Sequence, residues 1–313
     1  MLYILRRLGH TAVVLLGVSI VVFALIQLVP GDPVRLALGT RFSQESYDAL
    51  RAASGLDQPL IVQFFSYLGG AVTGDLGVSF RSGRPVTLIL LERLPATLSL
   101  AGAGMVVAIL ISFPLGIYAA LRSGKASDAI VRMISQAGVS VPDFWMALLL
   151  ILGFSASLRL LPSSGYVAFG EDPIEWLRHV TIPAVTVGLI AGSIMTRYVR
   201  SSVLEVLGSD HVRTARSKGL RERIVIGRHV VRNALVPIIT VGGVQLATML
   251  GGVIVVEVVV AWPGLGRLVY DAVAARDYPV IQGAVLLVAV MFLLINLAVD
   301  LLYARIDPRI RLS

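Results

Sequence analysis

Six long apolar runs constrain this chain more than any other feature of its sequence. A membrane-spanning helix needs about 20 apolar residues to cross about 30 Å of hydrocarbon. The third run is the least uniform, because polar residues such as Ser140 and Asp143 interrupt it. The sequence therefore predicts an all-α integral membrane protein with six transmembrane helices. The runs are residues 9–29, 96–120, 132–158, 180–199, 234–259 and 281–302.

The composition supports a bilayer environment. The chain is 56% hydrophobic and 15% charged, with a mean hydropathy of +0.84, which is too apolar for an ordinary soluble domain. The first run follows Arg6 and Arg7 but leads into the sequence VPGDP without a small-residue cleavage site. We expect it to be an uncleaved membrane anchor rather than a signal peptide.

The predicted spans divide the sequence into three parts. Residues 1–95 hold the first transmembrane helix and an extracytoplasmic segment, residues 96–303 form the main transmembrane domain, and residues 304–313 form a cytoplasmic tail. Within the extracytoplasmic segment, Ser43 and Gly55 bracket a short helix as its N-cap and its stop. The apolar and aromatic stretch that follows is typical of a helix lying in the membrane interface.

The distribution of basic residues predicts the orientation. Six spans place 17 of the 27 Lys and Arg residues on one side, together with both termini. By the positive-inside rule that side is cytoplasmic. Nine of the 17 lie between Arg197 and Arg232, in the loop after the fourth span. Topology alone does not explain so many basic residues in one loop.

This loop, about residues 200–232, has the pattern of two short helices joined by a sharp turn. Ser209 and Asp210 are candidate N-caps for a helix that runs to Lys218 and ends at Gly219. An amphipathic helix over 221–232 then returns to the bilayer. Two interpretations are open: the loop lies on anionic lipid, or the short helix inserts into a groove on another protein. Its small apolar face favours the groove.

Several other classes of protein lack support in the sequence. There is no cysteine, the four histidines are scattered, and no metal site is expected. No phosphate-binding P-loop and no cluster of catalytic residues is present. The net charge of +8 comes without the aromatic-interleaved basic surface of a nucleic-acid binder. A stand-alone channel or secondary transporter is expected to show inverted repeats, and none is convincing.

The short helix carries a recognisable motif. The sequence RTA at 213–215, followed by Gly219, resembles the cytoplasmic coupling loop of type I ABC importer permeases. Arg213 stands where the family usually has glutamate, which is similar to the dipeptide and oligopeptide branch. The resemblance covers essentially the whole chain and is to the B-type permease of that branch. The motifs that carry it are LVPGDP (28–33), GLDQP (55–59), GDLGVSF (74–80), TRYVRSSVLEVLGSD (196–210), WPGLGR (262–267), RDYPVIQG (276–283) and DPRIR (307–311).

The resemblance implies a subunit of an ATP-driven importer for dipeptides or oligopeptides in a bacterial cytoplasmic membrane. Its implied partners are a second homologous permease, one or two ABC ATPase subunits, an extracytoplasmic substrate-binding protein and membrane lipid, but no nucleic acid. ATP and Mg²⁺ belong to the ATPase subunits, and no cofactor is expected on this chain. Glutathione, nickel and oligosaccharides are alternative substrates within the same branch. The implied coupling residues are Arg213, Thr214, Ala215, Arg216, Lys218, Gly219 and Leu220.

Polar residues inside the spans are candidates for the translocation path, because buried polar groups in lipid are tolerated mainly where they face a cavity or a partner. Asp143 either contacts a peptide amino terminus or bonds Ser140 or the backbone at a helix break. Gln245 and Met249 either line the path or join helices. Glu257 lies toward the outer end, where gating or contact with a binding protein is the hypothesis.

Overall fold

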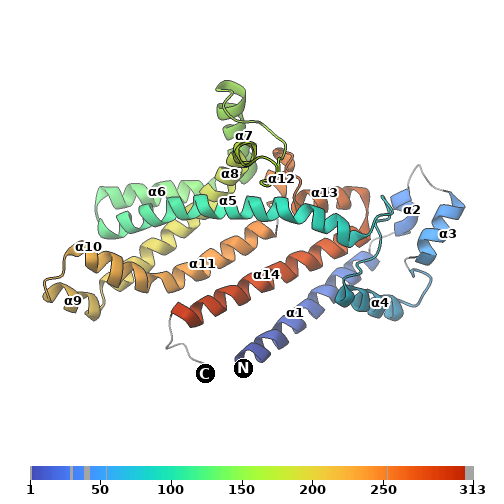
Figure 1. The fold of residues 1–313 in the computed structure, drawn as a ribbon, viewed down its shortest axis with the longest axis horizontal. Helices are drawn as coiled ribbons and strands as arrows, with labels where there is room; N and C mark the ends of the chain where they lie inside the picture. Colours follow the sequence, from blue (N-terminus) through green and yellow to red (C-terminus); the bar gives the residue numbers. More distant parts are fainter. Residues whose placement is uncertain (1, 29–30, 39–42, 54, 252, 307–313) are drawn as a thin grey trace. The chain divides into compact units, whose positions relative to one another are not determined.

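A computed structural model describes residues 2–28, 31–38, 43–53, 55–251 and 253–306. These residues form helices and loops, and within them the only strand-like pairing is an isolated bridge between Val78 and Pro85 (Figure 1). The helices are α1 (Leu2–Gln27), α2 (Pro33–Leu38), α3 (Gln44–Ala53), α4 (Leu60–Thr73), α5 (Val86–Leu121), α6 (Ala126–Ser140), α7 (Asp143–Leu150), η2 (Ile151–Ser157), α8 (Pro173–Leu207), α9 (Asp210–Ser217), α10 (Glu222–Ile224), η3 (Val225–Val231), α11 (Arg232–Leu250), α12 (Ile254–Val259), α13 (Leu265–Ala275) and α14 (Tyr278–Ile306).

The predicted spans correspond to long apolar helices. Within the part of the chain that the structure describes, five stretches are long and apolar enough to cross a membrane: 9–27 in α1, α5, α8, 222–250 and 278–302 in α14. A sixth span arises if the bent pair formed by α6 and by α7 with η2 counts as one. The all-α membrane fold is therefore confirmed, and a count of six spans agrees with it.

The third span differs from the straight helix that its sequence run suggests. Helix α6 ends at Ser140, and after Val141 and Pro142 the chain begins again as α7 at an angle of 100°. Proline has no backbone N–H and cannot continue the hydrogen-bond ladder, so a break is favoured here. The polar residues that interrupt the run mark this bend.

The fifth span is shifted from its predicted bounds of 234–259. The helical stretch begins at Glu222, runs through α10, η3 and α11, and ends at Leu250. The residues up to Val259 form the separate helix α12. A glycine pair follows Leu250, and glycine disfavours helix because it loses the most backbone freedom on folding. The amphipathic segment 221–232 and the span are thus one nearly continuous helical stretch.

The chain divides into two compact units. The first comprises residues 1–97 and 263–294, and the second comprises residues 98–262 and 295–313. This division is spatial, and it does not follow the predicted boundaries at 95 and 303, which stay a prediction. Residues 307–313 of the predicted tail, which include the DPRIR motif, lie outside the described residues.

The first unit joins distant parts of the sequence through a buried carboxylate. Asp277, which precedes α14, accepts hydrogen bonds from the Ser79 hydroxyl and from the backbone N–H of Phe80.

In the predicted extracytoplasmic segment, the Ser43 hydroxyl caps α3 by accepting from the Ser46 N–H at 3.1 Å. Gly55 adopts a positive φ of 63° just after that helix, as its predicted role as a stop requires.

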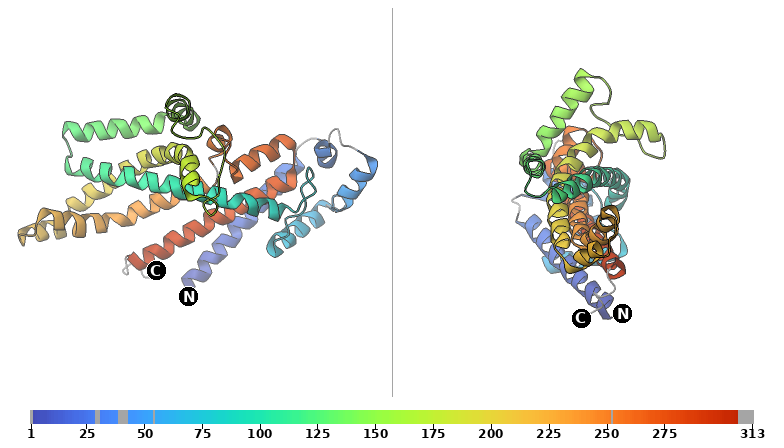
Figure 2. Two further views of the ribbon diagram at one scale, coloured as in Figure 1. Left: turned by 45° about the horizontal axis from the view of Figure 1, so that its top comes forward. Right: turned by 90° about the vertical axis from the view of Figure 1, so that its left-hand side faces the viewer.

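The second unit is built on close contact between α5 and α8. A Cβ atom at Gly188 would lie 2.6 Å from the Val107 Cβ and 2.8 Å from the Gly104 carbonyl oxygen. Only glycine fits at this close approach, and Gly188 and Gly192 have the GxxxG spacing that lets helix backbones pack closely. Figures 1 and 2 show α6 running beside α5, and α9 and α10 at one end of this unit.

Candidate functional site

Helix α9, which carries the predicted coupling motif, is anchored by its apolar face. Val212 is fully buried and Ala215 is 5% exposed, and both belong to a hydrophobic cluster with residues of α8, η3 and α11. The other members of the cluster are Ala120, Val199, Val203, Val225, Val230, Ala234 and Ile238. The helix therefore sits firmly on the ends of longer helices.

The remaining side chains of the coupling motif face solvent. Arg213, Thr214, Arg216 and Lys218 are exposed. Ala215 was predicted to dock on a partner together with them, but the structure buries it inside the chain. Residues three apart on a helix share a face, so Ala215 follows Val212 into the core. Ala215 therefore supports the exposed residues from within, and docking of the exposed residues on a partner stays a prediction.

The turn after α9 is a Schellman motif. The Gly219 N–H donates to the Arg216 carbonyl at 2.9 Å, and the Leu220 N–H donates to the Ala215 carbonyl at 3.4 Å. Gly219 has a φ of +73°, a conformation that residues with a Cβ rarely adopt. The predicted helix stop at Gly219 is confirmed, and the helix ends at Ser217, one residue earlier than expected.

The start of α9 is at the predicted residue but is not capped as predicted. Ser209 is the N-cap, yet its side chain accepts no capping hydrogen bond from a backbone N–H of the helix. Its hydroxyl donates instead to the Val206 carbonyl, which fixes the turn between α8 and α9. Asp210 lies in the first turn, where a carboxylate interacts favourably with the helix dipole.

Two polar links brace α9 against the helical stretch that follows. Arg216 donates to both carboxylate oxygens of Glu222, at 3.2 and 2.6 Å. The guanidinium of Arg216, one of the implied coupling residues, therefore has an acidic partner within the chain. The Asn233 side-chain amide lies 3.2 Å from Nε2 of His211 and also donates to the His229 carbonyl. Sequence reasoning missed both links, because nothing in the pattern pairs residues 6 or 22 positions apart across a turn.

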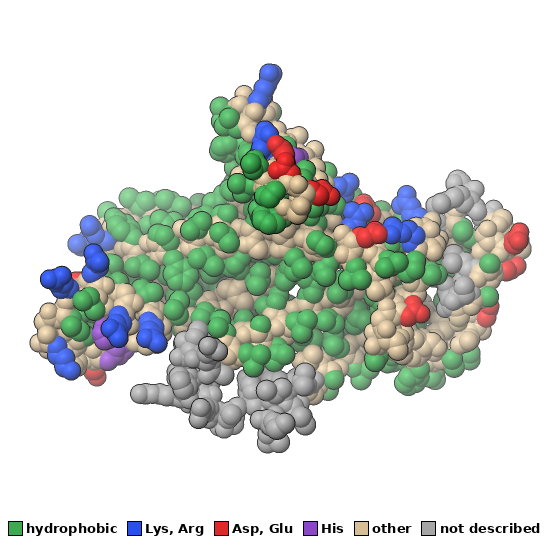
Figure 3. Space-filling model, in the orientation of Figure 1, with side chains coloured by type: hydrophobic (Ala, Val, Ile, Leu, Met, Phe, Trp, Pro, Cys, Tyr) green, Lys and Arg blue, Asp and Glu red, His purple; other side chains and the backbone are tan. Residues whose placement is uncertain are grey.

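Lys and Arg side chains gather at the end of the second unit that α9 and α10 form, while hydrophobic side chains cover much of the long helices (Figure 3). Arg213 makes a 3.6 Å ion pair with Asp210. Both side chains are largely exposed, so this pair contributes little to stability and leaves the arginine available to a partner.

The predicted path residues lie on three different elements. Asp143 begins α7 at the bend after α6, and its Oδ1 accepts from the Phe144 N–H at 2.8 Å. The Ser140 hydroxyl donates to the Gln136 carbonyl and not to Asp143. Of the two interpretations for Asp143, the contact with the backbone is therefore present, while a contact with substrate stays a prediction.

The other path candidates are more deeply placed. Gln245 is half-buried in α11, and Met249 one turn later is 6% exposed. A Cβ at Gly104 of α5 would lie 3.6 Å from the Met249 side chain, so this methionine lies in the contact between α5 and α11. Glu257 in α12 is 1% exposed. In this conformation Met249 and Glu257 do not present a free surface.

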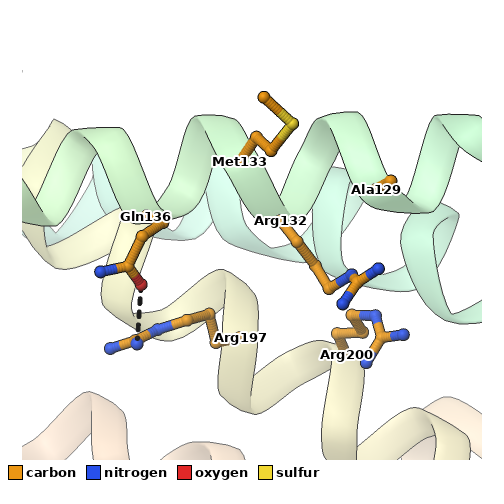
Figure 4. A pocket seen from close by; sticks show the side chains of 6 residues that line it. All are labelled: Ala129, Arg132, Met133, Gln136, Arg197 and Arg200. Carbon is orange, nitrogen blue, oxygen red and sulfur yellow. Dashed lines mark hydrogen bonds between the residues drawn. The ribbon is translucent and has the colours of Figure 1, made fainter.

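A basic groove between α6 and α8 was not predicted (Figure 4). Arg132 and Arg197 lie at the ends of predicted spans, and the sequence pattern does not point to Asp128, which contacts Arg132 and Arg200. The sequence feature that could have indicated the groove is Gln136, a polar residue inside the third apolar run. Sequence alone does not show that the two helices bring these side chains together.

Among the described residues, no three His, Cys, Asp or Glu side chains lie close enough together to hold a metal ion.

The long apolar helices, the bent pair and the anchored basic loop define a multi-pass helical membrane protein of transport type. The fold resembles solved importer structures. The inward-facing MetNI methionine ABC transporter matches with a TM-score of 0.54 at 17% identity, over 70% of this chain and 97% of that one. A chain from the crystal structure of an amino acid ABC transporter with histidines matches with a TM-score of 0.50 at 19% identity, over 70% of this chain and 94% of that one.

The chain belongs to the family of binding-protein-dependent transport system inner membrane components. The family model matches residues 112–312, and the model of its N-terminal region matches residues 1–101. It is 41% identical to the dipeptide transport system permease protein DppB of Escherichia coli over 99% of this chain and 98% of that protein. It is 42% identical to a putative peptide transport system permease protein of Brucella abortus, over 98% of both. It is also 42% identical to the glutathione transport system permease protein GsiC of Escherichia coli, over 99% of this chain and 98% of that protein.

Family membership defines the biochemical role in outline. The chain is a multi-pass inner-membrane permease subunit of an ABC importer and not an enzyme. Such an importer also contains a partner permease and ATPase subunits, and ATP and Mg²⁺ act in the ATPase subunits.

Proposed function

We propose that this chain carries dipeptides or oligopeptides inward across the membrane, together with a second homologous permease. An extracytoplasmic binding protein delivers the peptide, and one or two ATPase subunits drive transport from the cytoplasmic side, where both termini lie. The names of the relatives at 41% and 42% identity support a peptide substrate. The stronger concentration of Lys and Arg on one side supports the orientation.

Coupling to the ATPase is assigned to α9 and its turn. The single observation that carries this assignment is a short helix with a buried anchor, Val212, and an exposed polar face that ends in the positive-φ turn at Gly219. A short helix that is packed against long membrane helices moves with them as a rigid body. A displacement of its exposed face is therefore transmitted to the membrane helices. The face consists of Arg213, Thr214, Arg216 and Lys218, with Gly219 and Leu220 in the turn.

Replacing Gly219 with valine tests this assignment. A β-branched side chain disfavours the left-handed backbone conformation, so the turn and the exposed face are expected to shift. Peptide uptake by the reconstituted complex should fall about tenfold or more, while membrane insertion of the chain is retained. Gly227→Ala is the matched control, because Gly227 lies in the same loop without a positive φ and with open space around it. Full uptake by Gly219→Val would refute the coupling role.

The proposed path residues remain Asp143, Gln245, Met249 and Glu257. For Asp143, the free Oδ2 side of the carboxylate at a helix bend suits contact with a peptide ammonium group. Met249 and Glu257 reach a substrate only after a rearrangement of the helices that bury them. This fits an importer that alternates between conformations.

Glutathione is the second candidate substrate, because a glutathione permease is as similar as the peptide permeases. Nickel and oligosaccharides are alternatives that rest on the wider resemblance. Uptake of labelled dipeptide, glutathione, nickel and oligosaccharide by the reconstituted complex with its binding protein distinguishes them. Co-purification of a second permease and an ATPase tests the assembly. An active chain purified without them would contradict it.

A further inference from the structure

The groove between α6 and α8 is a cavity of about 490 Å³. Three arginines, one glutamine, one methionine and one alanine line it: Arg132, Arg197, Arg200, Gln136, Met133 and Ala129. Figure 4 shows Arg132 and Gln136 pointing from α6 towards Arg197 and Arg200 of α8, while the Met133 side chain points away from α8. The groove lies apart from α9 and its turn and from the predicted path residues, although Arg200 is the first residue of the predicted coupling loop.

The groove has an excess of positive charge. The Asp128 carboxylate beside the groove is 1% exposed and accepts two hydrogen bonds from Arg200. The Nε of Arg132 lies 3.6 Å from the same carboxylate. Two guanidinium groups therefore share one negative charge, and the third, that of Arg197, adds a further positive charge, so an anion is the missing partner.

Among the described residues, Arg197 is the one arginine of the three without a carboxylate partner. Its Nη1 atom lies 3.5 Å from the Gln136 side-chain oxygen, at the limit of a hydrogen bond. Guanidinium groups bind phosphate through paired N–H donors, and a glutamine amide adds a further donor. Arg132, Arg197 and Gln136 can thus surround one phosphate group.

The apolar surroundings indicate where that phosphate comes from. Met133 on the rim is 71% exposed, and Ile130 and Ile134 on the same helix are 56% and 57% exposed. Arg132 begins the predicted third span and Arg197 ends the fourth, so the groove lies at the predicted cytoplasmic boundary of the bilayer. Exposed apolar side chains beside clustered arginines fit an acyl chain attached to a charged headgroup.

We propose that this groove binds the phosphate of an anionic phospholipid of the cytoplasmic leaflet. The lipid bridges α6 and α8 beside the ion pair that already joins them. Its position rests on the orientation proposed above. The test measures lipid binding directly, so its result is separate from transport and from topology.

The probe is 1-palmitoyl-2-oleoyl-phosphatidylglycerol added to the purified importer complex, with phosphatidylcholine as the neutral lipid. Native mass spectrometry counts bound lipid. The double variant Arg132→Gln/Arg197→Gln is expected to bind phosphatidylglycerol about tenfold more weakly, since each basic residue near a membrane surface contributes on the order of 1 kcal/mol. Arg132→Lys/Arg197→Lys keeps the charge and should keep most of the binding.

Arg221→Gln/Arg223→Gln is the matched control, because it removes two exposed arginines from the same predicted side but outside the groove. Equal loss in this control, or no loss in the groove variant, overturns the proposal. Displacement of the lipid by millimolar inorganic phosphate would identify free phosphate as the ligand instead. Loss of the second permease from the groove variant would identify the groove as a contact between subunits.

A photoactivatable phosphatidylglycerol tests the wild-type complex without any variant. Cross-links are expected in residues 126–140 and 193–203. Cross-links confined to other parts of the chain would overturn the proposal even if the groove variants fail to assemble.

Discussion

Asp128 in α6 accepts hydrogen bonds from Nε and Nη2 of Arg200 in α8, at 2.6 and 2.7 Å. The two residues are 72 positions apart, and the carboxylate also accepts from the Gly124 N–H at 3.1 Å. The pair therefore fixes the start of α6 against the end of α8. Removal of one partner from such a buried pair leaves the other charge uncompensated.

Asp128→Ala should destabilise the protein by about 3 kcal/mol, because the Arg200 guanidinium loses both hydrogen bonds in a largely buried setting. Thermal unfolding of the purified complex, followed by size-exclusion fluorescence, measures the loss. Glu205→Ala is the control, because this carboxylate is exposed on the same helix. Equal melting temperatures for wild type and Asp128→Ala would contradict a structural role for the pair.

Gly188→Ala should disrupt the contact of α5 with α8, since its Cβ would clash with Val107 and with backbone. Gly192→Ala should have a milder effect, because the nearest atoms would lie at 3.3 Å. Gly102→Ala has nothing within 4 Å and should be tolerated. The melting temperatures of the three variants should therefore rise in the order Gly188→Ala, Gly192→Ala, Gly102→Ala. A variant of Gly102 as unstable as that of Gly188 would show that helix propensity, not packing, dominates.

The Arg216–Glu222 pair offers a test of partner choice. Each single charge reversal, Arg216→Glu or Glu222→Arg, should impair uptake by releasing α9 from α10, with little change in global stability because the pair is exposed. The double variant restores an attractive pair and should recover most of the uptake. If Arg216 acts mainly on an acidic ATPase residue, the double variant will stay as defective as Arg216→Glu.

Asp32 should make the predicted extracytoplasmic segment sensitive to acid. Burial raises the pKa of this carboxyl, but hydrogen bonds from the Tyr47 hydroxyl and from the N–H groups of Arg35 and Val34, with the charge of Arg51, outweigh it and hold the pKa below 3.8. The stabilisation is present above 3.8 and is lost as the pH falls through the lower folded-state pKa. Backbone amides of α2 and α3 should therefore exchange faster below about pH 4, after correction for intrinsic rates.

Asp32→Asn is the control for this acid effect. It should exchange quickly at neutral pH and lose the added sensitivity to acid. An unchanged exchange rate in wild type between pH 6 and pH 3 would contradict the role of Asp32.

The coupling loop illustrates how far local sequence signals reach. The cap position at Ser209, the short helix and the positive-φ turn at Gly219 follow from residue types over about ten positions, and the structure confirms where α9 begins and turns. Which side of α9 is exposed depends on the cluster around Val212. That cluster brings together residues from Ala120 to Ile238. The burial of Ala215 therefore could not be predicted from the residues near it in the sequence.

Residue patterns are enough to predict the membrane class, the approximate spans and the family, because the length of an apolar run, the distribution of Lys and Arg and a short motif are read directly along the chain. The bend between α6 and α7, the early end of α11, the Asp128–Arg200 pair and the basic groove beside it become evident from the packed helices. Each of these features depends on contacts between side chains of different helices. Burial, close packing and ion pairs arise from those contacts and not from neighbours in the sequence.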